Sequence, residues 1–463
     1  MRRCSALALV FAALLFSFDL FGAPATPPNI IFVLVDDLGW TDLGCFGSSF
    51  YETPNIDRLA AQGMRFSQAY SACTVCSPTR ASVMTGQYPA RLHITDWIGG
   101  HKRPFAKLSV PEWTLRLSPE IPNVAQVLKS TGYATASIGK WHLGPQDCWP
   151  ERQGFDVNAG GCDKGQPPSY FSPYKIPTLA DGPDGEFLSD RLTSEALTFI
   201  EKHRDRPFFI YLAHYAVHTP LMAKKKAIEK YQGKAVAGAP HSNATYAALV
   251  ESVDESVGRL LAKLDELKLS ERTVIVFTSD NGGLRSVTSN VPLRAGKGSA
   301  YEGGVRVPLI VKWPGVTKPG SVTSEPVISA DYFPTLLAMA GASGPPAHIV
   351  DGESLVPVLS QQGSLTRDAL YWHYPHYHPG GATPYGAIRE GEYRLVEFYE
   401  DRRVELYNLK EDIGEQQDLA AKLPGKAAAL RKKLADWRGR VNAQMPVANP
   451  AHDAEKDKVK KHR

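Results

Sequence analysis

Four short apolar runs, each followed by polar residues, constrain the fold of this chain more than any other feature of its sequence. The runs cover residues 30–35 (IIFVLV), 133–138 (YATASI), 208–213 (FFIYLA) and 274–279 (VIVFTS). Segments with helical periodicity separate them, which predicts an α/β sheet with helices on both faces. Ligands of such sheets bind beyond the carboxyl ends of the strands, so we expect the polar residues after the four runs to converge on one site.

The chain is long enough for two domains. Residues 26–363 are expected to form a large domain with a mostly parallel mixed sheet flanked by helices, the clearest helix covering residues 246–267. Beyond it, short aromatic and charged strands and a last helix at 422–441 predict a smaller C-terminal α+β domain with an antiparallel sheet over residues 364–447. Residues 448–463 are expected to be a disordered basic tail.

The N-terminus and the charge limit where the protein acts and what it binds. Residues 1–25 combine Arg2 and Arg3, an apolar run at 6–18 and the small residues APA at 23–25, which predicts a secretory signal peptide and a periplasmic or secreted protein. The run is too short to span a bilayer, so no stable membrane insertion is expected. Most of the formal net charge of +4 comes from the two ends of the chain, so no nucleic-acid partner is expected.

The six cysteines allow more than one interpretation. Cys4 would leave with the signal peptide. An even number of the remaining thiols is compatible with disulfides after export, but does not require them; these are Cys45, Cys73, Cys148 and Cys162. Cys73 and Cys76 also have the Cys-x-x-Cys spacing of a redox or metal motif.

Cys76 lies in the segment CTVCSPTRASVMTGQYPAR, residues 73–91. Pro78 suits the first turn of a helix, which places Cys76 near the helix N-terminus and Arg80 inside it. Free backbone N–H groups and the helix dipole favour an anion there. The segment therefore predicts an anionic substrate.

Acidic residues follow two of the four runs. Asp36 and Asp37 come after the first, and Asp280 and Asn281 after the last. Adjacent carboxylates repel unless a cation lies near them, and three carboxylates with one amide oxygen suit calcium or magnesium better than zinc. Taken singly, each pair could instead be a strand-ending turn or a helix cap.

Cations and proton carriers follow the other runs. They are Lys140 and His142 in GKWHLG, His218 in HTP, and Lys297 in a glycine-rich loop. Together these residues could bind a tetrahedral anion; alone, each could be a solvated lysine, a core histidine or part of an ordinary turn. His214 and His218 have the spacing of a helical zinc pair, but the strand-like sequence and nearby prolines argue against a helix.

The ordered blocks NIIFVLVDDLGW, CSPTRASVMTG, GKWHLG, HTP, FTSDNGG and GKGSAYEGGVRVP resemble those of type I, formylglycine-dependent sulfatases in the alkaline-phosphatase-like superfamily. The resemblance is greatest to secreted bacterial polysaccharide sulfatases of the arylsulfatase A type. It implies that a formylglycine-generating or anaerobic sulfatase-maturing enzyme converts Cys76 to formylglycine, the nucleophile. It further implies one calcium ion held by Asp36, Asp37, residue 76, Asp280 and Asn281. The sulfate-binding and proton-transferring residues would be Arg80, Lys140, His142, His218 and Lys297. No counterpart is evident for an additional serine that some members have in the active site.

The resemblance implies hydrolysis of a sulfuric ester by an exo-acting enzyme for polysaccharide or glycosaminoglycan fragments. Aromatic and imidazole groups suited to a sulfated sugar are Trp97, His101, Arg103, His373, His376 and His378, although the last three could also belong to an ordinary surface loop. Two alternatives remain. A phosphatase or phosphodiesterase of the same superfamily would need a Thr or Ser nucleophile and two zinc ions. A non-catalytic carbohydrate-binding relative would lack some of these cations or ligands.

Overall fold

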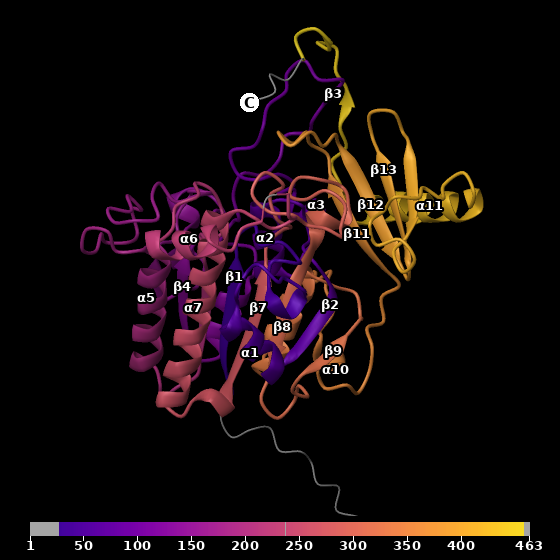
Figure 1. The fold of residues 1–463 in the computed structure, drawn as a ribbon. Coiled ribbons are helices and arrows are strands. Elements are labelled where there is room, and N and C mark those ends of the chain that lie inside the picture. Colours follow the sequence, from indigo (N-terminus) through magenta and orange to yellow (C-terminus); the bar gives the residue numbers. More distant parts are fainter. Residues whose placement is uncertain (1–26, 237, 458–463) are drawn as a thin grey trace, which may run out of the picture.

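A mixed β-sheet forms the centre of the protein in a computed structural model that describes residues 27–236 and 238–457 (Figure 1). The predicted signal peptide, residues 1–25, lies outside these residues. The sheet has nine strands in the described residues, and β8 runs antiparallel to its neighbours β2 and β7, whereas the other pairs are parallel. The strand order is β10 (Val327–Ile328), β2 (Met64–Tyr70), β8 (Arg306–Lys312), β7 (Thr273–Ser279), β1 (Asn29–Val35), β6 (Phe208–Ala213), β4 (Ala134–Gly139) and β5 (Val157–Ala159), with β9 (Ser321–Thr323) paired to β2. The predicted mostly parallel mixed sheet is therefore confirmed.

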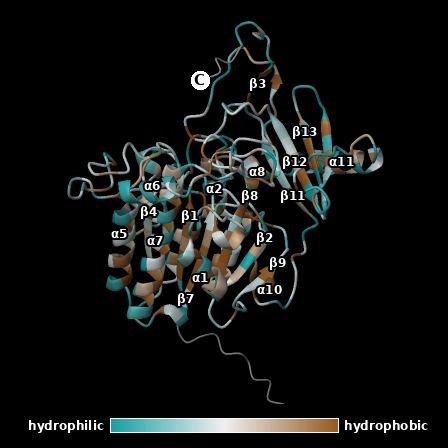
Figure 2. Cartoon of the chain, in the orientation of Figure 1, coloured by the Kyte–Doolittle hydropathy of each residue, from teal (hydrophilic) through white to brown (hydrophobic). Residues whose placement is uncertain are grey.

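Both faces of the sheet are covered by helices, which explains why its strands read as unbroken apolar runs. Alternate residues of β1 enter two different cores: Ile31 and Val33 pack on one side, Phe32 and Leu34 on the other. Figure 2 shows hydrophobic central strands and hydrophilic residues on parts of the surrounding helices. One face carries α1 (Pro54–Gln62), α5 (Leu188–Lys202), α6 (Lys225–Gln232) and α7 (Ala244–Glu266), and the other carries α2 (Cys76–Thr85), α4 (Val124–Ser130), α9 (Tyr332–Met339) and α10 (Val356–Leu359).

The helix predicted at 246–267 is α7, and its start has a clear local cause. The Asn243 side chain accepts a hydrogen bond from the Tyr246 backbone N–H at 3.0 Å, which caps the helix. Shorter helical segments lie in the loops between the layers. These are α3 (Pro89–Leu92), α8 (Glu302–Val305) and the 3₁₀ turns η1 (Gly44–Phe46), η2 (Gln146–Cys148), η3 (Pro150–Arg152), η4 (Ser270–Arg272) and η5 (Ser329–Asp331).

A second, antiparallel sheet confirms the predicted C-terminal α+β fold. Its strands follow one another in sequence order and α11 (Pro424–Arg440), the helix predicted at 422–441, packs against them. The strands are β11 (Ala369–Tyr374), β12 (Tyr385–Glu390), β13 (Tyr393–Phe398) and β14 (Val404–Asn408). Residues of this unit share a core with Val75 and Tyr88 of the large domain, so the two units meet beside Cys76.

The prediction of a disordered tail from residue 448 was wrong for residues 448–457. The strand β15 (Val447–Ala448) pairs with β3 (Leu108–Ser109), and Figure 1 shows this pair above the C-terminal sheet. Asn449 Nδ2 then donates to Ala106 O at 2.7 Å, and Arg103 Nη2 lies 2.6 Å from Asp457 Oδ2. Composition alone missed these contacts because the partners lie more than three hundred positions earlier in the chain.

Candidate active site

The carboxyl ends of four parallel strands bring the predicted site residues together, as the sequence suggested. The strands β1, β4, β6 and β7 are neighbours in the sheet. Asp36 and Asp37 follow β1, Lys140 and His142 follow β4, His218 follows β6, and Asp280 and Asn281 follow β7. The loop before α8 adds Lys297. The convergence therefore follows from the topology of the sheet.

The helix α2 places Cys76 and Arg80 at this edge. It begins at Cys76, ends at Thr85 and is buried along its whole length; Gly86, with φ 72° in the left-handed region, caps it. Residues four apart lie on the same side of a helix, so Arg80 lies one turn behind Cys76. Cys76 thus occupies the helix N-terminus, where backbone N–H groups favour an anion.

Asp36 and Asp280 are fully buried and are paired with two cations. Arg80 Nε donates to Asp280 Oδ2 at 2.9 Å, and Lys140 Nζ donates to Asp36 Oδ2 at 2.7 Å. Burial raises the pKa of Asp36 well above its usual value; repulsion from Asp280 adds to this, whereas Lys140 and Arg80 act in the opposite direction. A further cation beside Asp36 would lower that pKa and favour the carboxylate.

Asp37 is held by Lys297 and Asn281. Lys297 Nζ lies 2.7 Å from Asp37 Oδ1, and Asn281 Nδ2 donates to the same oxygen at 2.7 Å. Burial acts to raise the pKa of Asp37, but Lys297 and His218 outweigh it and hold that pKa well below the usual range. The backbone of Asp37 has φ 62°, a strained value for a residue with a side chain, as is common at functional sites.

Two buried oxygens indicate that these residues fit a metal ion. Asp36 Oδ1 and Asn281 Oδ1 have no hydrogen-bond partner within the described residues. Asp37 and Asp280 adjoin them, since the Asp37 N–H donates to Asp280 Oδ1 at 3.2 Å. The resulting donor set of carboxylate and amide oxygens suits a hard cation such as Ca²⁺ or Mg²⁺.

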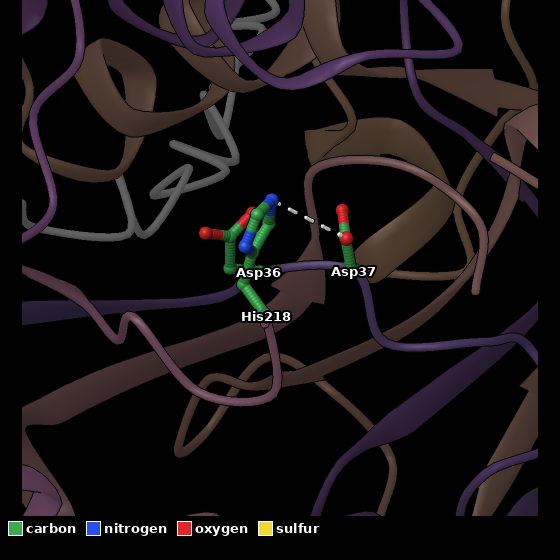
Figure 3. Close-up of side chains that lie close together, drawn as sticks. All are labelled: Asp36, Asp37 and His218. Atoms are coloured by element: carbon green, nitrogen blue, oxygen red, sulfur yellow. Dashed lines mark ion pairs between the residues drawn. The ribbon is translucent and has the colours of Figure 1, made fainter. Parts of the chain in front are cut away.

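A second possible ligand group shares two of the carboxylates. Ligand atoms of Asp36, Asp37 and His218 lie within 4.8 Å of one another (Figure 3). His218 Nε2 is 3.6 Å from Asp37 Oδ2, but it also accepts a hydrogen bond from Lys297 Nζ at 3.1 Å. Because that lone pair already faces an ammonium group, the all-oxygen set is the better fit.

His142 is oriented toward Cys76 as a neutral base. Its Nε2 donates to Ile98 O at 3.1 Å, which leaves an Nδ1 lone pair 3.5 Å from Cys76 Sγ. Burial, with Lys140, lowers the pKa of His142 well below its ordinary value. Gly165 allows this arrangement, because a Cβ there would lie 2.6 Å from His142 Cε1. His142 can therefore accept a proton from residue 76.

His218 is neutral as well, with the opposite assignment of its ring nitrogens. Nδ1 donates to Thr219 O at 2.7 Å, and Nε2 accepts from Lys297. Burial and Lys297 lower the pKa of His218 to about 3, although Asp37 acts to raise it. Any proton that His218 gives to a substrate must therefore first reach Nε2, where the nearby Asp37 carboxylate favours the protonated ring.

A cavity of about 410 Å³ opens over Cys76, within the size range of small-ligand sites. The predicted residues that line it are Cys76, Trp97, His142, His218, Lys297 and His378. Sequence analysis missed the loop residues Val75, Ile98, Gly165, Gln166, Thr219, Leu284 and Pro379. Of these, only the glycine-rich stretch around Gly165 carried a signal of close backbone approach.

The rim of the cavity joins the loop after α3 to the segment that follows β11. Three successive loop residues pair with alternate residues of the C-terminal unit. The pairs are Thr95 Oγ1 with His376 Nε2 at 2.8 Å, Asp96 Oδ1 with the Tyr374 hydroxyl at 2.8 Å, and the rings of Trp97 and His378 with centroids 5.5 Å apart. The aromatic part of the rim is therefore fixed by buried polar contacts behind it.

The structure places the other predicted substrate residues outside the cavity lining. Arg103 pairs with Asp457, as described above. His373 is buried and bonded to the Tyr399 hydroxyl and Gln444 O at 2.8 Å each, and His376 is buried against Thr95. The pKa of His378 is lowered to about 4, mainly by burial and by Lys297. His101 contributes weakly to the same shift, which places it near the rim. Trp97 and His378 are thus the substrate candidates that the structure brings to the pocket.

Within the described residues, the geometry supports neither disulfide pairing of the cysteines nor a helical zinc pair of His214 and His218. All five cysteines in residues 27–236 and 238–457 are free thiols. His214 does not join His218: it follows β6 directly, is buried, and its Nε2 contacts Ser256 Oγ at 3.1 Å. The strand and the following loop replace the helix that a zinc pair would need.

The family model described as Sulfatase matches residues 28–342 of this chain. The chain belongs to the sulfatase family. A second model, described as N-sulphoglucosamine sulphohydrolase, C-terminal, matches residues 296–439. The protein is therefore an enzyme of the alkaline-phosphatase-like superfamily that hydrolyses sulfate esters, which decides against the phosphatase and non-catalytic alternatives.

Relatives cover most of the chain. A sulfatase of Formosa agariphila is 34% identical over 94% of both chains. Human arylsulfatase A is 35% identical over 80% of this chain and 75% of its own. Among solved structures, the Ps i-CgsB crystal structure aligns with a TM-score of 0.77 and 30% identity, over 92% of this chain and 95% of that one. The phosphonate monoester hydrolase of Agrobacterium radiobacter, with a TM-score of 0.69 and 19% identity over 91% of this chain and 99% of its own, shares the fold.

Proposed function

We propose that this enzyme removes sulfate from a sulfated carbohydrate, with formylglycine at position 76 as nucleophile and one calcium ion as cofactor. The observation that carries the proposal is the position of Cys76. It lies at the N-terminus of α2, in the cavity, within 3.5 Å of a neutral histidine and beside the carboxylate and cation cluster. A small motif, Cys76-x-Pro78-x-Arg80, provides the sequence context for the modification.

The carbohydrate assignment rests on the rim and on two relatives. Trp97 and His378 offer an aromatic face and an imidazole next to the nucleophile position, a combination suited to a sugar ring. An N-acetylgalactosamine-6-sulfatase of Rattus norvegicus is 35% identical over 76% of this chain and 69% of its own. Ps i-CgsB has also been solved in complex with k-i-k-neocarrahexaose, at 29% identity and a TM-score of 0.77. Exo action on a terminal sugar is proposed from the resemblance of the sequence blocks.

Calcium would be held by Asp36, Asp37, Asp280 and Asn281, with residue 76 completing the set. When bound, a calcium ion would neutralise carboxylate repulsion and help to bind the anionic sulfate group. Arg80, Lys140 and Lys297 already balance the three carboxylates, so an added divalent cation would make the site attractive to an anion. The choice of calcium over magnesium rests on the resemblance of the sequence blocks.

The protein's own residues supply the remaining steps. Hydrated formylglycine would provide two geminal hydroxyl groups, one to attack sulfur and one whose loss of a proton releases sulfate. His142 Nδ1 faces residue 76 and would accept that proton. His218, once protonated at Nε2, would protonate the departing sugar oxygen, and Lys140 and Lys297 would orient the sulfate.

Maturation and export complete the proposal. We infer that a formylglycine-generating or anaerobic sulfatase-maturing enzyme modifies Cys76, and that residues 1–25 direct export to the periplasm or the medium. Among the helices of the described part of the chain, none is long and apolar enough to cross a membrane.

A desulfation screen across defined sulfated saccharides, aryl sulfates and phosphate esters tests the function, with mass spectrometry of the Cys76 peptide in the same preparation. The expected result is turnover of a carbohydrate sulfate and an aldehyde at position 76. Full activity with only an unmodified thiol would refute the nucleophile, and turnover confined to non-carbohydrate sulfates would refute the substrate class.

A further inference from the structure

A second hollow opens beside the active-site cavity. It has a volume of about 590 Å³ and is lined mainly by the loop from Arg285 to Ala295. The wall between the two cavities is continuous in sequence: Leu284 lines the active site and Arg285 lines the hollow, whereas Ala295 lines the hollow and Lys297 lines the active site. One loop, residues 284–297, therefore borders both cavities.

The lining of this hollow suits an anion with hydroxyl groups. Arg285 is its one charged residue, and none of its lining residues is acidic. Arg285, Ser242 and Ser286 are exposed, and their side chains make no hydrogen bond or ion pair within residues 27–236 and 238–457. A guanidinium group offers donors in a planar fork that matches a carboxylate or a sulfate, and serine hydroxyls can pair with sugar hydroxyls.

The loop that forms the hollow is held in place before any ligand binds. Asn290 Nδ2 donates to Gly283 O at 2.9 Å, while Asn290 Oδ1 accepts from the Gly283 N–H at 3.1 Å. Thr288 Oγ1 donates to the buried Asp42 at 2.8 Å. The Lys297 N–H also donates to Gly283 O, at 3.1 Å. The loop therefore connects the hollow rigidly to the catalytic Lys297.

We propose that this hollow is a second subsite, which binds an anionic sugar residue next to the one that carries the scissile sulfate. The proposal rests on the carbohydrate function proposed above and narrows the substrate class to oligosaccharides with a carboxylate or a second sulfate on the neighbouring sugar. When one sugar places its sulfate in the active site, the sugar linked to it would enter the hollow. There it would meet the unpaired Arg285 guanidinium group and serine hydroxyls, and no acidic residue that would repel an anion. Carboxylate and sulfate share the chemistry that Arg285 recognises.

The test compares wild type with Arg285→Ala on matched sugars. The probes are based on two sulfated sugars, N-acetylgalactosamine 6-sulfate and galactose 4-sulfate. Each is used as the free sugar, linked to glucose and linked to glucuronic acid. A doubly sulfated disaccharide shows whether the subsite binds sulfate as well as carboxylate. We expect wild type to prefer the glucuronate-linked over the glucose-linked probe by about three- to tenfold in kcat/KM, as one partly exposed charge-assisted contact would give. Arg285→Ala should abolish that preference and leave the free sugars unaffected. Added salt should weaken the preference of wild type.

Lys318→Ala is the matched control, because it removes another exposed cation, from the connection between β8 and β9 at the end of the sheet opposite the active site. It should retain the preference for the glucuronate-linked probe.

Isothermal calorimetry on the same probes separates the subsite proposal from the proposed sulfatase function. Binding that depends on the neighbouring charge and on Arg285, without desulfation, would contradict the proposed function and support the subsite. Equal behaviour of the glucose-linked and glucuronate-linked probes with wild type, including no binding of either, would overturn the subsite, as would a preference that survives in Arg285→Ala.

Discussion

The Tyr374 hydroxyl donates a hydrogen bond of 2.8 Å to Asp96 Oδ1, and this contact ties the C-terminal sheet to the loop that carries Trp97. Both partners are buried, and Asp96 Oδ1 also accepts from the Trp97 N–H at 2.9 Å. Burial raises the pKa of Asp96 well above its usual value, against the effect of the Tyr374 hydrogen bond. The contact thus holds a buried carboxyl group directly behind the active-site rim.

Tyr374→Phe should loosen that rim without touching the nucleophile position. We expect KM for a carbohydrate sulfate to rise about three- to tenfold, an unchanged kcat for 4-nitrophenyl sulfate, and a loss of about 1–3 kcal/mol in the free energy of unfolding. Tyr377→Phe is the control, since its hydroxyl accepts from the Leu108 N–H at 3.0 Å and donates to Glu400 at 2.6 Å, away from the cavity lining. An equal rise in KM in both variants would show that the effect is general destabilisation.

His218→Ala should slow a carbohydrate sulfate far more than an activated aryl sulfate. A sugar alkoxide leaves poorly without a proton, whereas 4-nitrophenolate does not need one, and acid assistance is worth about 10² to 10⁴ in rate. The comparison holds where sulfate transfer limits both reactions. Lys297→Ala removes a cation proposed to bind the sulfate of either substrate, so it should slow both reactions to a similar extent. Equal losses on the two substrates for His218→Ala would mean that His218 binds sulfate instead.

His142→Ala should fail at a later step. Its Nδ1 faces residue 76, so removing it should impair release of sulfate from the enzyme with either substrate. Intact-mass measurement during turnover is expected to show a sulfated enzyme that accumulates. A variant that turns over slowly but never carries sulfate would contradict the assignment of His142 as the base.

The strands and the convergence of the polar residues that follow them were predictable because both depend on local sequence. An apolar run with polar residues after it defines a buried strand and its functional end, as at Asp36 and Asp280. The substrate rim was harder, because it depends on side-chain direction. Successive residues of an extended strand point to opposite sides, so within β11 His373 turns away from Tyr374, and His378, beyond the strand, reaches the cavity. Leu284 and Ile98 carried no signal, since only tertiary packing places their loops at the cavity.

Chelation should inactivate the enzyme, and calcium should restore it. Without a metal ion, the buried carboxylates of Asp36, Asp37 and Asp280 depend on Arg80, Lys140 and Lys297 alone. A ligand that binds the folded state stabilises it, so calcium should also raise the melting temperature, by an amount that increases with its concentration. Asp37→Asn should abolish that shift. Stoichiometric zinc in the active enzyme, with no response to calcium, would contradict the all-oxygen site.

Glu415 links the two units through a buried network of charges. Its Oε2 accepts from the Glu302 N–H at 2.7 Å, and its Oε1 lies 3.7 Å from Arg394 Nε. Burial raises the pKa of Glu415 to about 8; Arg394 acts to lower it, and the carboxylate of Glu302 adds to the rise. Glu302 is itself paired with Arg394, at 2.6 Å, and with Arg306, at 3.1 Å. The nearby cations are therefore already neutralised in part, which leaves Glu415 protonated in the folded protein at neutral pH.

Glu415→Gln should therefore change how stability depends on pH. In the folded state Glu415 keeps its proton up to a pKa of about 8, whereas in an unfolded chain its pKa has the ordinary value for glutamate of about 4.5. Between these two pKa values the folded state binds more protons than the unfolded state, so Glu415 makes the free energy of unfolding fall as pH rises. The slope is at most roughly 1.4 kcal/mol for each pH unit, and the total decline is a few kcal/mol, on the order given by the pKa difference. Above about pH 8 its contribution is constant.

Glutamine has the same shape as glutamate and no proton to lose. Urea unfolding between pH 5 and pH 8.5 should therefore show a smaller decline in the free energy of unfolding for Glu415→Gln than for wild type. Glu392→Gln, which removes an exposed carboxylate paired with Lys410, is the control and should keep the wild-type slope. Identical slopes in wild type and Glu415→Gln would mean that Glu415 is ionised in the folded protein and that Arg394 outweighs its burial.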